Sequence, residues 1–444
     1  MSVTVVVGAQ WGDEGKGRVV DYLAARADLA IRFQGGDNAG HTVVNDFGRF
    51  ALHLIPCGIF YPGVRNLLGA GTVVNLDTVS EETAMLQAAR VSADNLWIDL
   101  RAHLIWPYHR QLDGAEEDRR KREAGAEGEE MGTTRRGIGP VYADKHAYNG
   151  IRAGDLHHPD LLRERLELVL PLKNRQLAGY GLRQLSLDEC LDQAAAWRAR
   201  YGERIVDTLP WVRDAVRDGQ RVLLEGQLGV GRDVNWGIYP YTTASSPTAG
   251  GACLGAGIPP RAIDDVLGVV KAYSTSVGGG PFPTELHDEY GTMLQEIGRE
   301  FGATTGRVRR CGWVDGVAIG YASYLNGFTG IAVTKLDVLD HFDEIQLCTG
   351  YRIGEQVIDY LPDTATQALV EPVYETWPGW RTDTSGCRTW DDLPARAQAY
   401  LRRIEELAAA PICFVSVGPE RSQMVVIPAP SGGGTPLAPL AGLG

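Results

Sequence analysis

Short runs of apolar residues alternate along the chain with segments whose hydrophobic positions recur every three to four residues. Many residues in the apolar runs are β-branched, which is typical of buried strands. The alternation predicts an α/β fold in which helices cover the faces of a sheet. Strands are expected over residues 3–7, 29–33, 50–55, 96–99, 222–224, 266–273, 331–336, 345–352 and 412–417. Helices are expected over residues 19–27, 80–89, 313–325 and 395–408.

Four stretches interrupt this alternation. Both charge signs are dense in residues 113–136, which favours a solvated helix or mobile loop. Residues 159–220 have helical periodicity and predict a helical insertion. Residues 226–257 are rich in glycine and broken by polar residues, and their length favours a functional loop. Residues 428–444 form a low-complexity tail that is unable to bury a core.

Composition narrows the classes of function. The net charge of −13 argues against a nucleic-acid or anionic-membrane partner, because phosphate surfaces require a basic face. The seven cysteines are scattered without metal-ligand spacing and indicate reduced thiols. The chain starts directly with a strand-like run, and no apolar run reaches membrane-spanning length. A cytoplasmic protein with small-molecule substrates is therefore expected.

The segment Gly8 to Gly17 reads Gly-Ala-Gln-Trp-Gly-Asp-Glu-Gly-Lys-Gly and directly follows the first apolar run. Its glycines allow backbone N–H groups to approach an anion, and Lys16 adds a positive charge before a helix. This is a phosphate cradle, but a standard P-loop has Ser or Thr where Gly17 stands. The oxygen ligand for a metal ion must come from elsewhere, and Asp13 is the nearest source.

Three further loops carry candidate chemistry. Residues 34–42 follow the second predicted strand, so His41 should face the same crevice as the cradle and bind a phosphoryl oxygen. Residues 302–310 combine hydroxyls with arginines, which suit a small dicarboxylate. Asp337, at the end of an apolar strand, can accept hydrogen bonds from both N–H groups of a guanine edge, with the stem of Lys335 along the base.

Together these stretches resemble the adenylosuccinate synthetase family over roughly residues 3–427. The resemblance implies a single catalytic domain over 1–427, with a large, mostly parallel central sheet, flanking helices and a variant P-loop-like phosphate loop. The matching segments are Gly-Ala-Gln-Trp-Gly-Asp-Glu-Gly-Lys-Gly (8–17), Asn-Ala-Gly-His-Thr (38–42), Arg-Gly-Ile-Gly-Pro (136–140), Tyr-Pro-Tyr (239–241), Gly-Pro-Phe-Pro-Thr-Glu (280–285), Ala-Thr-Thr-Gly-Arg (303–307), Thr-Lys-Leu-Asp-Val-Leu (334–339) and Gly-Pro (418–419).

The resemblance implies GTP-dependent ligation of L-aspartate to IMP through a 6-phosphoryl intermediate, in a homodimer. Asp13 would be the catalytic base, with Lys16 and His41 stabilising the migrating phosphoryl group, and Asp13 and Gly40 would hold Mg²⁺. The GTP site would comprise Gly12, Gly15, Lys16, Gly17, Lys335, Asp337, Ser416 and Gly418. The acceptor site would comprise Asn38, Thr134, Gln227 and Thr243, and the aspartate site Thr304, Thr305, Arg307 and Arg309.

The chain departs from the family pattern around the acceptor site. Arg135 stands where glycine is expected, and Tyr148 where the family has an arginine that crosses the dimer interface. Leu228 replaces a glutamine expected near the purine 6-oxygen, with Gln227 one place early. The other changed positions are Asp37, Asn235, Trp236, Ile238 and Ser276.

These departures leave three hypotheses open. The first is an ordinary adenylosuccinate synthetase, and the second is a paralogue that ligates aspartate to another oxo-purine or analogue. The third is a GTP-binding regulatory or resistance protein without turnover, against which the retained Asp13, His41 and aspartate-loop arginines argue.

Overall fold

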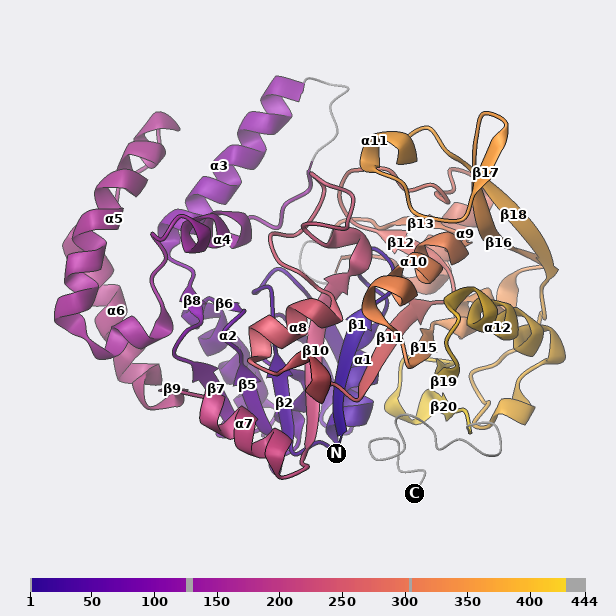
Figure 1. Cartoon of the computed structure of the whole chain (residues 1–444), viewed down its shortest axis with the longest axis horizontal. Coiled ribbons are helices and arrows are strands. Elements are labelled where there is room, and N and C mark those ends of the chain that lie inside the picture. The colour runs from indigo at the N-terminus through magenta and orange to yellow at the C-terminus, as the bar shows by residue number, and fades with distance from the viewer. Residues whose placement is uncertain (1, 125–130, 303–305, 429–444) are drawn as a thin grey trace.

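The central feature of the fold is a ten-stranded sheet with the order β20-β19-β15-β11-β1-β10-β2-β5-β7-β9 (Figure 1). The computed structural model describes residues 2–124, 131–302 and 306–428. Neighbouring strands run parallel except β20, which is antiparallel to β19. The predicted α/β fold with a large, mostly parallel sheet is confirmed. The strands are β1 (Ser2–Gly8), β2 (Leu29–Arg32), β5 (Arg65–Leu68), β7 (Leu96–Asp99), β9 (Ile205–Val206), β10 (Arg221–Gly229), β11 (Asp265–Lys271), β15 (Gly330–Thr334), β19 (Ile412–Ser416) and β20 (Met424–Val426).

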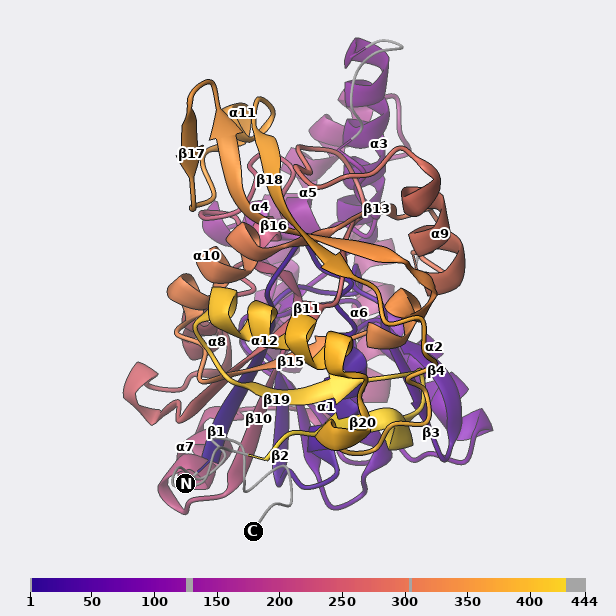
Figure 2. The ribbon, with the colours of Figure 1, turned by 90° about the vertical axis from the view of Figure 1, so that its right-hand side faces the viewer.

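Helices cover both faces of this sheet, so its strands are apolar on both sides. Val6 of β1 belongs to a hydrophobic cluster with α1, α2, α5 and α6, whereas Val5 and Val7 join α8, α10 and α12 on the opposite face. Figure 2 shows α12 lying across β15 and β19. The helices are α1 (Lys16–Ala24), α2 (Leu76–Ala88), α3 (Pro107–Ala124), α4 (Ile138–His146), α5 (Pro159–Gly179), α6 (Leu187–Tyr201), α7 (Leu209–Arg217), α8 (Ala249–Ala256), α9 (Glu289–Gly298), α10 (Gly316–Asn326), α11 (Thr364–Gln367) and α12 (Ala395–Ala408).

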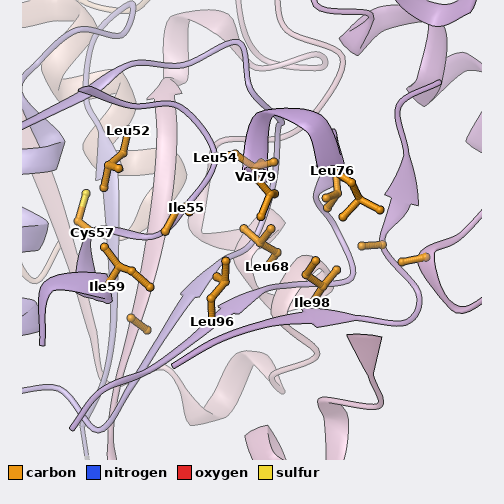
Figure 3. Packing of buried hydrophobic residues seen from close by; sticks show 14 of the residues in the cluster. Leu52, Leu54, Ile55, Cys57, Ile59, Leu68, Leu76, Val79, Leu96 and Ile98 are labelled. Carbon is orange, nitrogen blue, oxygen red and sulfur yellow. The ribbon is translucent and has the colours of Figure 1, made fainter. Parts of the chain in front are cut away.

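The strand expected over residues 50–55 was wrong in part. The chain forms a separate hairpin there, with β3 (His41–Asn45) paired to β4 (Gly48–Leu52). The hairpin turns at residues 46–47, and Gly48, which starts β4, has a φ of 127° that favours glycine. Beyond it, Leu54, Ile55 and Cys57 enter the hydrophobic cluster that also contains Leu68 and Leu76 (Figure 3).

Two helix and loop predictions also need correction. The helix expected over residues 313–325 begins only at Gly316, because Asp315 caps it and Val314–Asp315 forms strand β14. The segment 226–257 is not all loop, since β10 extends to Gly229 and α8 packs on the sheet. The predicted helical insertion contains α5, α6 and α7 but also β9, whose buried Ile205 pairs with β7 at the sheet edge.

The remaining strands form small sheets outside the central one. A parallel pair joins β6 (Val73–Val74) and β8 (His103–Leu104), and an antiparallel pair joins β12 (Ser274–Ser276) and β13 (Arg310–Gly312). A four-stranded sheet contains β14, β16 (Glu344–Ile353), β17 (Gln356–Ile358) and β18 (Glu371–Pro378). No helix in the described ranges has the length and apolar character needed to cross a bilayer.

Close packing of α8 on the end of β2 depends on glycine. A Cβ atom at Gly255 would lie 1.8 Å from the Phe33 carbonyl oxygen, whereas one at Gly250 of the same helix would meet nothing closer than 3.7 Å. We expect Gly255→Ala to lower the free energy of unfolding by about 1–3 kcal/mol through overpacking. Gly250→Ala is the matched control and should raise it by up to about 1 kcal/mol, because alanine favours helix. Urea unfolding measures both; equal effects would contradict this packing.

Candidate active site

The loops that follow the central strands meet at the carboxyl edge of the sheet, as ligand-binding loops do in α/β folds. The loop after β1 is tied to its neighbours on one side. The Gln10 side chain donates to Ser274 Oγ over 3.2 Å, and Thr334 Oγ1 at the end of β15 donates to the Glu14 carbonyl. The predicted approach of the loop after β2 is seen at Gly17, where an added Cβ would lie 3.0 Å from His41 Cβ.

The phosphate loop ends in the first turn of α1, which begins at Lys16 rather than at residue 19 as expected. Gly15 caps the helix with a φ of 87°, a conformation that favours glycine. Lys16 and Gly17 thus lie at the helix N-terminus, where free N–H groups favour an anion. Buried Glu14 accepts from Gly12 N over 2.9 Å and lies 2.6 Å from Lys16 Nζ. Sequence reasoning missed Glu14, although it is part of the quoted motif.

Asp13 joins the phosphate loop to the arginine-rich loop. Its backbone φ is 60°, and its carboxylate is 29% exposed. Arg309 Nη2 lies 2.9 Å from Asp13 Oδ1, across 296 residues of sequence. Arg307 Nη1 lies 3.3 Å from where a Cβ on Gly132 would stand, so the 132–140 turn borders the same loop. Thr304 and Thr305 lie outside the described residues.

His41 is held by a buried acid that the sequence did not single out as functional. Its Nδ1 lies 2.6 Å from Glu225 Oε1, and Arg32 Nη1 lies 3.3 Å from the same oxygen. Burial lowers the pKa of the His41 imidazole, against the opposing effect of Glu225. Burial would raise the pKa of Glu225, but the hydrogen bond from His41 and the charge of Arg32 lower it to about 2. At neutral pH a neutral His41 therefore donates from Nδ1 to an ionised Glu225.

Cys57 lies beside Glu225, so three residues of types that can bind a metal ion are close together. The ligand atoms of His41, Cys57 and Glu225 are all within 4.8 Å of one another. The Arg32 guanidinium already neutralises Glu225, and the Cys57 N–H donates to its second oxygen over 2.8 Å. The cluster is therefore an ion-paired support for His41.

Two of the predicted acceptor residues, Asn38 and Gln227, meet at the loop after β2. Gln227 is fully buried; its Nε2 donates to Asn38 Oδ1 over 3.0 Å and its Oε1 accepts from Arg32 over 2.6 Å. This geometry assigns Gln227 to holding Asn38 in place. Leu228, with a φ of 60°, instead packs beside Gly12 of the phosphate loop.

The residues predicted to form a pocket for the base lie at the ends of β15 and β19, two neighbouring strands of the sheet. Asp337 follows Lys335, and burial raises the pKa of its carboxyl while Arg18 and Lys335 oppose this effect. Arg18 was missed by sequence reasoning; it donates to Ser416 Oγ, and Ser416 in turn donates to the Gly418 carbonyl over 3.1 Å. The four predicted residues of this pocket are thus brought together, with Arg18 as a fifth member.

Several predicted site residues carry buried polar atoms without a protein partner in the described part of the chain. Native proteins rarely leave such atoms unsatisfied unless a ligand or solvent occupies the position. The atoms are His41 Nε2, Thr243 Oγ1, Arg309 Nε and Asp337 Oδ1. They are distributed over the regions predicted for phosphoryl, acceptor, aspartate and base binding.

Comparison with known proteins identifies this arrangement. A sequence model of adenylosuccinate synthetase matches residues 5–425. The chain belongs to the adenylosuccinate synthetase family. It is 47% identical to adenylosuccinate synthetase 1 of Methanosarcina acetivorans over 430 residues, covering 96% of this chain and 100% of that protein. It is 49% identical to the adenylosuccinate synthetase of Heliobacterium modesticaldum over 427 residues, covering 96% of this chain and 99% of that protein.

Solved structures agree with this family membership. Fully ligated adenylosuccinate synthetase from Plasmodium falciparum has a TM-score of 0.89 at 35% identity, covering 96% of this chain and 100% of that one. Cyanophage S-2L succinoaminodeoxyadenylate synthetase, bound to dGMP and dATP as an energy donor, has a TM-score of 0.60 at 19% identity. The match covers 100% of this chain and 99% of that one. At that identity the second likeness shows the fold alone.

Two of the departures from the adenylosuccinate synthetase pattern lie at the surface of the chain. Arg135 forms an ion pair of 2.5 Å with Asp118 on α3, so it is engaged at the surface. Tyr148 is 96% exposed. Asp37 is buried, where it accepts from Asn75 over 3.0 Å and from Thr78 over 2.7 Å.

Ser276, which stands at a usual arginine position of the family, contacts an arginine that comes from another loop. Arg232 Nη2 lies 2.6 Å from Ser276 Oγ and 2.8 Å from the Val277 carbonyl oxygen. Burial lowers the pKa of Arg232 to about 10, which keeps it charged at neutral pH. Trp236 is 58% exposed, and its carbonyl oxygen accepts from Tyr321 over 2.9 Å. The guanidinium of Arg232 therefore lies beside Ser276 although it comes from another loop, and the sequence did not predict this contact.

Proposed function

We propose that the protein ligates L-aspartate to the 6-oxo position of IMP, consuming GTP and releasing adenylosuccinate, GDP and phosphate. The observation that carries this proposal is the contact between Asp13 and Arg309, 2.9 Å apart. It joins a base in the phosphate loop to an arginine suited to a carboxylate substrate. A protein that only bound GTP would have no use for this second site.

The chemistry follows from the placement of the side chains. A 6-oxo group is a poor leaving group, so phosphorylation by GTP prepares it for displacement by the α-amine of aspartate. Asp13 would take the N1 proton as the γ-phosphoryl group moves to O6. Lys16 and His41 would stabilise charge on that group. The approaching phosphates favour protonation of His41 Nε2, and Glu225 then forms an ion pair with the imidazolium.

A Mg²⁺ ion fits the donors available in this site. Asp13 offers a partly exposed carboxylate and Gly40 a backbone carbonyl, and such hard oxygen ligands are those that Mg²⁺ prefers. The hydrogen bond from Arg309 goes to Oδ1 of this carboxylate. The ion would supply charge neutralisation for the transferred phosphoryl group.

Guanine selection is assigned to Asp337, whose buried Oδ1 lacks a partner in the part of the chain that the structure describes. We expect Asp337→Asn to lower kcat/KM for GTP by about 100-fold, since a charge-assisted hydrogen bond contributes about 1.5–3 kcal/mol. The same variant should use XTP better than the wild type, because its amide N–H can donate to the 2-oxo group. Steady-state kinetics with both nucleotides tests this; Asp359→Asn, on the surface, is the control. An unchanged ratio of GTP to XTP would remove Asp337 from base selection.

A related enzyme acting on another oxo-purine is the second candidate. Leu228 favours it, because an apolar side chain stands beside Gly12 where the family has an amide. Mass spectrometry of the protein incubated with GTP, Mg²⁺, L-aspartate and either IMP or other oxo-purines decides between the two. A product from IMP at a turnover typical of an enzyme supports the first proposal, and a product only from another acceptor supports the second. No product with any acceptor would favour a non-catalytic GTP-binding protein.

The proposal also includes a homodimer of a cytoplasmic enzyme, each chain with one catalytic domain over residues 1–427. The exposed Tyr148, at the position where the family has an arginine that crosses the dimer interface, is available to contact a second copy. All seven cysteines are free, which agrees with a reducing compartment. Hydrophobic clusters shared by the helical insertion and the central sheet support a single domain. Light scattering of the purified protein tests the dimer.

A further inference from the structure

A buried carboxylate, Glu300, lies where the base pocket and the aspartate site meet. It follows α9 and is fully buried. Its Oε1 lies 3.1 Å from both Lys271 Nζ and Lys335 Nζ, and it also accepts from the Tyr273 hydroxyl. Its Oε2 lies 2.6 Å from Arg309 Nη1. One carboxylate therefore holds three cations that come from three different strands or loops.

The two oxygens of Glu300 face two different substrate sites. Lys335 belongs to the predicted base pocket, and Arg309 reaches Asp13 through its other guanidinium nitrogen. Main-chain bonds reinforce the second link, because the Arg309 N–H donates to the Glu300 carbonyl over 2.9 Å. Lys335 and Arg309 are both cations, and each lies against Glu300, which therefore connects them.

The charges explain why this connection is strong. Lys271, Lys335 and Arg309 would repel one another in a buried site without Glu300. Burial lowers the pKa of Lys271 to about 8, while Glu300 acts in the opposite direction. Burial would raise the pKa of Glu300, but the three cations hold it well below its usual value. A shift of either Lys335 or Arg309 toward a ligand therefore changes the field at the other cation.

We propose that Glu300 is a positioning residue that couples nucleotide binding at Lys335 to L-aspartate binding at Arg309. This inference rests on the function proposed above. Nucleotide seated against Lys335 fixes the Glu300 carboxylate, which in turn orients Arg309 for the aspartate carboxylate. Because coupling between two binding sites is reciprocal, aspartate must tighten nucleotide binding by the same factor.

Calorimetry of GDP binding, with and without L-aspartate, measures this factor directly. In the wild-type protein we expect aspartate to tighten GDP binding several-fold. In Glu300→Gln the factor should fall to about one, while GDP affinity without aspartate changes less than about threefold. The KM for aspartate in the ligation assay should rise by about tenfold or more, with a smaller change in kcat. Glu296→Gln, an exposed position in α9, is the matched control and should behave like the wild type.

Other outcomes would overturn the proposal. The proposal is wrong if folded Glu300→Gln keeps the wild-type factor by which aspartate tightens GDP binding. It is also wrong if aspartate does not change GDP binding in the wild-type protein. If Glu300→Gln does not fold, as judged by thermal melting, Lys335→Gln breaks the same chain of contacts from the other end. An unchanged factor in that variant would also reject the inference. Failure of the proposed ligase function is distinguishable, because it appears as absence of product in the wild type, whereas the calorimetry reads coupling without turnover.

Discussion

Asp13→Asn should reduce the rate of ligation by about three orders of magnitude, because a positioned general base contributes about 10²–10⁴-fold to a rate. Asparagine keeps the size of the side chain and tolerates the left-handed backbone at this position, where φ is 60°. The loop should therefore keep its shape while the proton acceptor is lost. The loss should fall mainly on kcat, with little change in the affinity for GDP in the absence of Mg²⁺, the ion that Asp13 is proposed to hold. Product formation followed by mass spectrometry, with calorimetry for GDP, tests both parts.

The control for Asp13 is Asp46→Asn, an exposed position near the turn between β3 and β4. It should leave turnover unchanged. Asp13→Ala should lose activity like Asp13→Asn, although alanine also strains the left-handed backbone. Turnover near the wild-type level in Asp13→Asn would mean that another group takes the N1 proton, and the assignment of the base would be wrong.

Glu225→Gln should lower the free energy of unfolding by about 3–5 kcal/mol, as expected when one partner of a buried ion pair is removed. Glu225 is fully buried. It forms ion pairs with Arg32 and His41 and accepts a hydrogen bond from the Cys57 N–H. Glutamine would leave the Arg32 charge without a counterion. The midpoint of urea unfolding measures the loss, and kcat should also fall because His41 loses the acceptor that orients its ring.

The pH dependence of stability gives an independent test of the same acid. The folded-state pKa of Glu225 is about 2, below its usual 4.5, so ionisation favours the folded state. This contribution is fully present above about pH 4.5 and is lost as pH falls toward 2. The difference corresponds to about 3 kcal/mol. Between these pH values, stability should therefore fall less steeply in Glu225→Gln than in the wild type.

Glu344→Gln, at an exposed position at the start of β16, is the matched control for Glu225. It should change neither the urea midpoint nor its pH dependence. A Glu225→Gln protein as stable as this control would show that Arg32 finds sufficient compensation from Gln227 and the His53 carbonyl, which it also contacts.

Much of the fold and of the ligand-binding motifs could be predicted from local sequence. The apolar runs at 3–7, 96–99 and 412–417 correspond closely to β1, β7 and β19, because a parallel strand buried on both faces must be apolar throughout. The helix over 395–408 has the predicted bounds, since its apolar positions form one face. The phosphate loop was recognisable because close approach of backbone to an anion requires glycine at particular positions.

The tertiary structure alone decided how the charged groups of the site pair. Glu225 and Glu300 are buried acids, and local sequence does not show which cation neutralises each one. His41 meets Glu225 across 184 residues, and Asp13 meets Arg309 across 296. A buried charge is tolerable only beside its partner, and that partner is determined by the packing of distant strands. The sequence by itself thus determined the strands, the phosphate loop and the family resemblance, whereas the folded chain determined which charges act together.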